Sequence, residues 1–165
     1  MAPPPQKEIA ADHFSPDTLE FIRLLAMHGV KYLIIGGEAV IFHGYARFTG
    51  DVDFFYLRDA ENSQKLFAAL QEFWSGDVPG LNAANELLEP GLVVQFGRPP
   101  NRIDLLNAPD GLSFERAWST KEEVAISGSN FSTYFLSLEQ LILNKRAAGR
   151  AKDQDDLTYL ERRRR

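Results

Sequence analysis

The chain has 165 residues, no cysteine and a formal net charge of −5, and 44% of its residues are hydrophobic. This length favours one domain with a full core, and the lack of cysteine excludes disulfides and thiolate metal sites. The net charge excludes a globally basic surface for nucleic acid. No apolar run approaches the roughly 20 residues of a membrane span, and the N-terminus lacks the apolar segment of a signal peptide. We therefore expect a cytoplasmic protein that has no membrane partner.

The N-terminal region divides into a tail and the start of the folded domain. Residues 1–13 contain three consecutive prolines and mixed polar residues, and they predict a flexible tail. We assign residues 14–165 to one domain. Ser15 followed by Pro16 is typical of a helix start, and Gly29 is typical of the helix end.

In the next stretch two glycines separate a predicted strand from a predicted short helix. Residues 32–35 are apolar and predict a buried strand, and Gly36 and Gly37 then allow a sharp turn and a close approach to the backbone. Residues 39–43 predict a short helix whose free N–H groups would suit an anion.

Asp51 and Asp53 open a second predicted strand. Their spacing of two residues places both carboxylates on one face of that strand. Two adjacent carboxylates repel each other, and a divalent cation relieves that repulsion.

The remaining elements follow from turns, apolar periodicity and helix caps, and we expect Asp59, Ser137 and Asp153 to be caps. We predict helices over 59–74, 81–88, 113–118, 138–148 and 152–163, and strands over 92–96, 102–106, 123–126 and 131–135. The strands over 92–96 and 102–106 would form a hairpin that brings Asp104 beside Asp51 and Asp53.

This ordered set of motifs resembles the DNA polymerase beta-like nucleotidyltransferase superfamily. The resemblance rests on the apolar strand, the glycine pair, the short helix, the Asp-x-Asp pair and the third acid at Asp104. It covers the chain from about residue 30 to the end. It implies an α/β nucleotidyltransferase fold, with a mixed, mostly antiparallel sheet and helices on one side.

Several segments are similar to the abortive-infection (AbiEii-type) toxin branch of that superfamily. They are Gly37-Glu-Ala39, Ala46-Arg-Phe-Thr-Gly-Asp-Val-Asp53, Lys145-Arg-Ala-Ala-Gly-Arg150 and Lys152-Asp-Gln-Asp-Asp-Leu157. The similarity implies a toxin-like or tRNA-directed role, with an antitoxin as a protein partner, as one option. An acceptor hydroxyl on another RNA, a protein or a small molecule stays open.

The resemblance implies transfer of a nucleotide from an NTP to an acceptor hydroxyl, with Mg²⁺ or Mn²⁺ as the cofactor. The implied catalytic and metal-binding residues are Asp51, Asp53 and Asp104. The implied nucleotide-binding residues are Gly36, Gly37, Arg47, Thr49 and Lys145.

Other interpretations of these residues remain open. Acids are common where a strand begins, Arg47 can pair with an acid instead of a phosphate, and Lys145 can be a surface lysine. Glu38 departs from the superfamily pattern, because its carboxylate beside the glycine turn would repel a triphosphate. The alternative to an enzyme is a catalytically degenerate module that binds a nucleotide or a partner protein. A third option is an antitoxin-like or structural binding module.

Overall fold

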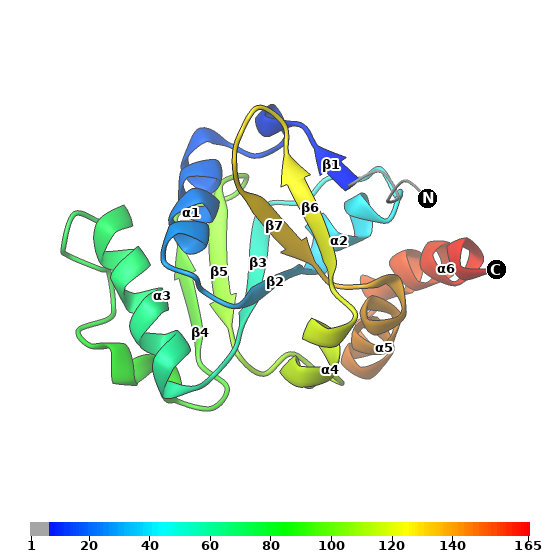
Figure 1. Cartoon of the computed structure of the whole chain (residues 1–165). Helices are drawn as coiled ribbons and strands as arrows, with labels where there is room; N and C mark the ends of the chain where they lie inside the picture. The colour runs from blue at the N-terminus through cyan, green and yellow to red at the C-terminus, as the bar shows by residue number, and fades with distance from the viewer. Residues whose placement is uncertain (1–6) are drawn as a thin grey trace.

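The computed structural model describes residues 7–165. Within that range seven strands form a single sheet in the order β1-β6-β7-β2-β3-β5-β4 (Figure 1). The strands are β1 (Lys7–Ile9), β2 (Tyr32–Ile35), β3 (Asp51–Tyr56), β4 (Val93–Phe96), β5 (Arg102–Leu106), β6 (Glu122–Ile126) and β7 (Ser132–Phe135). The predicted α/β fold with a mixed sheet is confirmed. Parallel pairs are as frequent as antiparallel pairs among the described strands, because β1–β6, β2–β7 and β3–β5 are all parallel.

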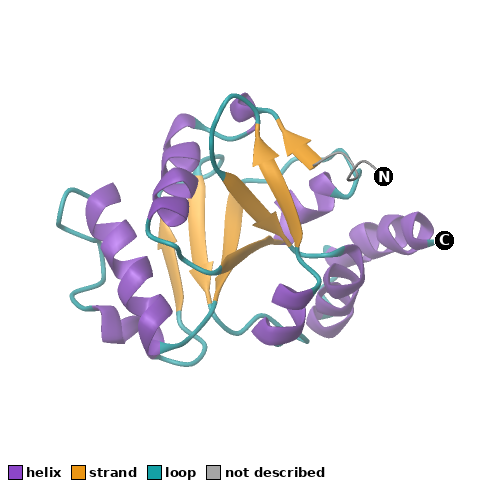
Figure 2. Cartoon of the chain, in the orientation of Figure 1, coloured by secondary structure: helices purple, strands orange, loops and turns teal. Residues whose placement is uncertain are grey.

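The helices flank this sheet (Figure 2). They are α1 (Pro16–Met27), α2 (Gly36–Phe42), α3 (Ala60–Phe73), α4 (Phe114–Ser119), α5 (Leu138–Ala148) and α6 (Asp153–Arg164), with two 3₁₀ helices, η1 (Ala11–His13) and η2 (Ala84–Leu88). The predicted caps explain several of these boundaries. The side chains of Ser15, Asp59 and Ser137 accept hydrogen bonds from backbone N–H groups in the first turns of α1, α3 and α5. Gly149 ends α5 in a left-handed conformation with φ of 61°.

Helices cover both faces of the sheet, which corrects the expectation of helices on one side. Phe54 and Phe55 are neighbours in β3, so their rings point to opposite faces. The Phe54 ring lies 5.2 Å from the ring of Phe21 in α1, and the Phe55 ring lies 5.1 Å from that of Phe114 in α4. Figure 1 accordingly shows α1 and α3 on one side, with α4 and α5 on the other. All four residues of β2 are buried, as expected of a strand covered on both faces.

The structure differs from the predicted tail over the part that it describes. Residues 1–6 lie outside the described residues. Residues 7–9 form β1, which pairs in parallel with β6 at one edge of the sheet, and η1 follows directly. A three-residue edge strand such as Lys7–Ile9 is too short to show a strand pattern in the sequence, and its pairing with β6 depends on a distant segment.

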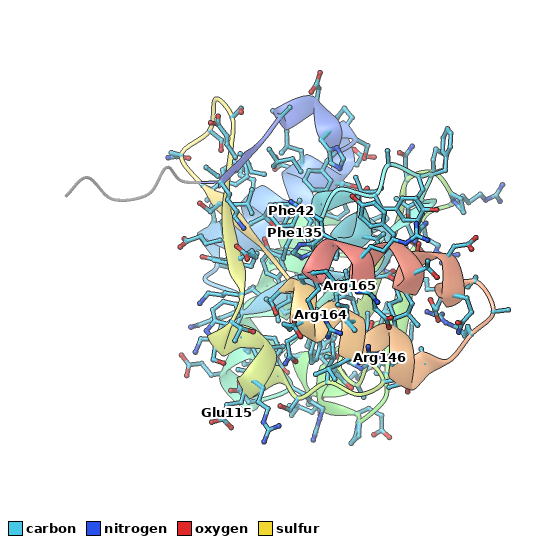
Figure 3. The ribbon with its side chains drawn as sticks, turned by 90° about the vertical axis from the view of Figure 1, so that its right-hand side faces the viewer. Phe42, Glu115, Phe135, Arg146, Arg164 and Arg165 are labelled. Atoms are coloured by element: carbon cyan, nitrogen blue, oxygen red, sulfur yellow. The ribbon has the colours of Figure 1, made fainter. Side chains whose placement is uncertain are left out.

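Helices α5 and α6 lie side by side and form one wall of the site described below (Figure 3). Short helix α2 connects this wall to the sheet. The ring of Phe42, at the end of α2, stacks on Phe135 of β7 with the centroids 4.4 Å apart. This contact packs the end of α2 against β7.

Candidate active site

Three aspartates converge where β3 and β5 lie side by side. The two strands are parallel neighbours, and their register sets Asp53 opposite Asp104. Asp51 shares a face with Asp53 because the two are two residues apart. Asp51, Asp53 and Asp104 each offer a carboxylate oxygen, and these oxygens lie within 4.8 Å of one another. The convergence predicted from the sequence is therefore confirmed.

The surroundings of Asp53 favour a proton or a cation. Burial, the charges of Asp51 and Asp104, and a hydrogen bond with Asp104 raise the pKa of Asp53 to about 7. Its Oδ1 atom is buried and has no hydrogen-bond partner among the described residues. Carboxylate oxygens are the ligands that Mg²⁺ and Mn²⁺ prefer. The donor set and the unpartnered oxygen together fit a divalent metal ion.

Arg102 bridges two of the three acids. Its Nη2 donates to Asp51 Oδ2 at 2.6 Å, and its Nε donates to Asp104 Oδ1 at 2.9 Å. Asp104 also accepts a hydrogen bond from Gln95 of β4 at 3.3 Å. We assigned no role to Arg102 from the sequence. The signal was present, because Arg102 stands two residues before Asp104 on the same strand and so shares its face.

The glycine pair makes room for the acidic side chains. Helix α2 begins at Gly36 instead of Ala39, and Gly36 has a positive φ of 67°. A Cβ atom at Gly36 would collide with Asp53 Oδ2, and one at Gly37 would lie 2.6 Å from Thr49 Oγ1. Both glycines line the pocket above the triad. Their first role is thus to let β3 and the loop before it approach α2 closely.

We expect Gly36→Ala to destabilise the protein more than Gly80→Ala does. Gly80 has a similar φ of 78° and no neighbour within 4 Å of an added Cβ, so it isolates the backbone strain of roughly 1–2 kcal/mol. The collision with Asp53 should add about 1 kcal/mol or more to the loss in free energy of unfolding at Gly36. Urea denaturation measures both losses.

A double variant tests whether Asp53 is the cause. Adding Asp53→Ala to Gly36→Ala should recover the excess loss, because it removes the carboxylate that the new methyl group meets. Equal losses at Gly36 and Gly80 would show that the glycine serves only the backbone conformation.

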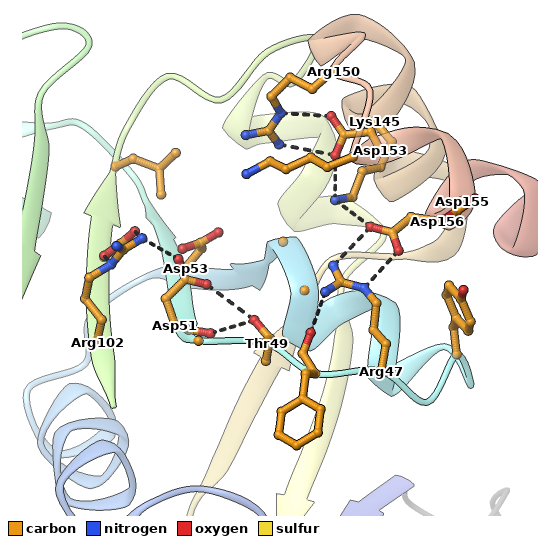
Figure 4. A pocket seen from close by; sticks show the side chains of 18 of the residues that line it. Arg47, Thr49, Asp51, Asp53, Arg102, Lys145, Arg150, Asp153, Asp155 and Asp156 are labelled. Carbon is orange, nitrogen blue, oxygen red and sulfur yellow. Dashed lines mark hydrogen bonds and ion pairs between the residues drawn. The ribbon is translucent and has the colours of Figure 1, made fainter. Parts of the chain in front are cut away.

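A network of charged side chains around the buried Lys145 forms the opposite wall of the pocket (Figure 4). Lys145 of α5 is buried, and its Nζ lies 3.0 Å from Asp153 Oδ1 and 3.1 Å from Asp156 Oδ2, both on α6. Arg47 Nη2 donates to Asp156 at 3.0 Å, and Arg150 Nε donates to Asp153 at 2.8 Å. Three cations thus surround two carboxylates, which leaves this network with one excess positive charge.

The pocket between the two walls has a volume of about 590 Å³. Its lining includes every residue that the sequence analysis placed in the site: Gly36, Gly37, Arg47, Thr49, Asp51, Asp53, Asp104 and Lys145. Lys145 is buried, so its interpretation as a surface lysine is wrong. Arg47 pairs with Asp156, which agrees with its interpretation as the partner of an acid. Thr49 Oγ1 donates to the backbone oxygen of Asp51 at 3.2 Å.

The acids on α6 have a role that we did not predict from the sequence. Asp153 was expected to cap this helix, but the N-cap is Lys152, and no side-chain cap bond is made there. Asp153 instead neutralises Lys145 and Arg150, which lower its pKa against the effect of burial. The spacing of Asp153 and Asp156 by three residues places them on one helix face and was the available signal.

Glu38 does not face the pocket, which corrects the expectation that it would repel a phosphate. Its side chain is 10% exposed, and one of its oxygens lies 2.7 Å from Nε2 of His13 in η1. This contact raises the pKa of His13 above its usual value of 6.5, chiefly through the hydrogen bond. Glu38 therefore ties the N-terminal segment to α2.

The His13–Glu38 contact should make stability depend on pH. Because the folded-state pKa of His13 is raised, the contact stabilises the protein fully below about pH 6.5, and the gain is lost as pH rises through the folded-state value. The free energy of unfolding of the wild type should exceed that of His13→Gln by up to about 1 kcal/mol more at pH 6 than at pH 8.5, since the pair is partly exposed.

Chemical denaturation at the two pH values measures this difference. Glu38→Gln should remove the same pH-dependent part, because it leaves His13 without its anionic partner. A difference between the wild type and His13→Gln that stays constant with pH would show that no charge is involved.

The family of the chain agrees with this geometry. A family model described as "Nucleotidyltransferase of unknown function (DUF6036)" matches residues 17–161. The chain therefore belongs to this family, and the predicted membership of the nucleotidyltransferase superfamily is confirmed. None of the curated proteins that were compared with the chain matches it. No helix among residues 7–165 is long and apolar enough to cross a membrane.

Proposed function

We propose that this protein transfers a nucleotide from an NTP to an acceptor hydroxyl and releases pyrophosphate. The observation that carries the proposal is the convergence of three carboxylates within 4.8 Å, in a pocket of a chain that belongs to a nucleotidyltransferase family. Asp51, Asp53 and Asp104 would hold Mg²⁺ or Mn²⁺. When bound, such ions neutralise phosphate charge and lower the pKa of an attacking hydroxyl.

The acids of the triad divide into two roles in this proposal. Asp51 and Asp53 would hold both metal ions, and Asp104, opposite Asp53 in the sheet, would complete the ion on the acceptor side. Asp53 carries a proton for part of the population near pH 7 when no metal is bound. That proton must leave when the carboxylate becomes a ligand, so metal affinity should rise with pH.

The opposite wall suits the anionic part of the substrate. The excess positive charge of the network around Lys145 and Arg47 supports binding of a triphosphate against that wall. We propose that both side chains bind the phosphates, together with Thr49 and the backbone of Gly36 and Gly37, as the resemblance implies. Asp153 and Asp156 hold the two cations in place until the phosphates arrive.

The acceptor is the open part of the proposal. The similarity of Arg47-Phe-Thr-Gly-Asp-Val-Asp53 and Lys152-Asp-Gln-Asp-Asp-Leu157 to the AbiEii-type toxin branch supports a tRNA acceptor, a toxin role in the cytoplasm and an antitoxin partner. Basic residues in the last turn of α6, Arg162 to Arg164, add positive charge that an RNA phosphate could meet. A protein or small-molecule acceptor is compatible with the same nucleotide pocket.

One observation favours a second candidate, a regulatory module that binds a nucleotide without catalysis. The Arg102 guanidinium forms ion pairs with Asp51 and Asp104, which are two of the three acids that a metal would need. If the guanidinium stayed there permanently, the triad would be a structural ion cluster. Metal dependence of nucleotide binding distinguishes the two candidates.

We expect Mg²⁺ together with an NTP to raise the melting temperature of the wild type, because a ligand that binds only the folded state stabilises it. At ten times the dissociation constant the shift should be about 3–6 °C for a chain of this size. Asp51→Asn combined with Asp53→Asn should abolish the shift in differential scanning fluorimetry.

The matched control changes two exposed acids away from the pocket, Asp77→Asn and Glu115→Gln, and should keep the full shift. An equal shift in the Asp51 and Asp53 double variant would show that metal and nucleotide bind elsewhere. A shift with NTP that is the same in EDTA would favour the regulatory module.

A further inference from the structure

Arg102 occupies the position of a cation in a site built from acids. Its guanidinium makes three hydrogen bonds there: Nη2 to Asp51 Oδ2 at 2.6 Å, Nε to Asp104 Oδ1 at 2.9 Å, and Nη2 to Asp104 Oδ2 at 3.1 Å. Its side chain is 29% exposed and lines the pocket, so solvent and ligands reach it. Figure 4 shows it beside Asp51 and Asp53, across the pocket from Arg150 and Lys145.

The hydrogen bonds of Arg102 and the coordination of a metal ion compete for the same oxygen atoms. Both oxygens of Asp104 and one of Asp51 accept from the guanidinium. A metal ligand must direct its lone pairs at the ion, and it cannot keep a short bidentate bond to arginine through the same lone pairs. Asp53 differs from its neighbours, because its buried Oδ1 accepts no hydrogen bond from any group in residues 7–165.

We propose that Arg102 is a displaceable counter-ion that couples metal binding to nucleotide binding. It holds Asp51 and Asp104 together before the metal arrives, a divalent ion displaces its guanidinium, and the guanidinium then binds the phosphates of the NTP. This inference rests on the proposed function of the same pocket. Arg102 is a positioning residue for the acids in the metal-free protein and a phosphate ligand in the loaded one.

Once displaced, the guanidinium of Arg102 can bind the phosphates of an NTP in the same pocket. It is tethered to β5 two residues before Asp104, so it stays on the pocket wall after it leaves the carboxylates. A planar guanidinium binds two phosphate oxygens in the same bidentate way as it binds a carboxylate. When the metal binds alone, Arg102 loses its hydrogen bonds to Asp51 and Asp104 and gains none. When the metal binds with NTP, hydrogen bonds from Arg102 to the phosphates replace them. Each ligand should therefore strengthen the binding of the other by the same factor.

The test measures Mn²⁺ binding, by electron paramagnetic resonance and isothermal titration at pH 8, with and without α,β-methylene-ATP. In the wild type the nucleotide should strengthen Mn²⁺ binding about tenfold or more, and Arg102→Gln should bind Mn²⁺ alone about tenfold more tightly than the wild type. The nucleotide should strengthen Mn²⁺ binding by a smaller factor in Arg102→Gln. Arg98→Gln, on the β4–β5 turn, removes an arginine that makes no ion pair among the described residues and should behave as the wild type.

A second variant covers the case in which Arg102→Gln does not fold. Arg102→Lys keeps the charge but loses the bidentate geometry, and its Mn²⁺ affinity should also exceed that of the wild type, by a smaller factor. Equal Mn²⁺ affinity in the wild type and the Arg102 variants would overturn the counter-ion role while leaving the metal site intact. Absence of Mn²⁺ binding from all forms, even with nucleotide, would overturn the proposed function as well.

Discussion

The repulsion among three carboxylates is the constraint on which this structure depends. Asp51, Asp53 and Asp104 hold oxygens within 4.8 Å of one another, and two of them are further desolvated by burial. Such a cluster cannot stay fully ionised without a compensating cation. The metal-free protein meets the requirement in two ways, through the bridging guanidinium of Arg102 and through a raised pKa at Asp53.

The rest of the fold places a cationic wall opposite this acidic one. The parallel pairing of β3 with β5 sets the register of the acids, and the adjacent helices α5 and α6 carry the cations. Lys145 is nearly inaccessible to solvent and is held by Asp153 and Asp156. The acidic wall attracts metal ions, and the cationic wall attracts anions. A pocket with both walls fits a metal–nucleotide complex better than it fits either ligand alone.

The sequence predicted the parts of the site that depend on local spacing. The Asp51–Asp53 pair follows from the two-residue period of a strand, and the helix caps at Ser15, Asp59 and Ser137 follow from short-range hydrogen bonding. The β4–β5 hairpin was predictable from the local sequence, whereas the resemblance to a known superfamily pointed to Asp104 as the third acid of the site.

Contacts between distant segments were not predictable in the same way. The partner of Glu38 is His13, in a segment that was taken for a tail, and the partners of Lys145 lie on another helix. Such pairs depend on how distant segments pack together, and the local spacing of residues along the chain does not reveal that packing.

The most direct measurement of the central claim is anomalous diffraction from crystals grown with Mn²⁺ and α,β-methylene-ATP. We expect Mn²⁺ within about 2.0–2.6 Å of carboxylate oxygens from Asp51, Asp53 and Asp104. Bound nucleotide with no Mn²⁺ at these oxygens, and with Arg102 still between Asp51 and Asp104, would contradict it.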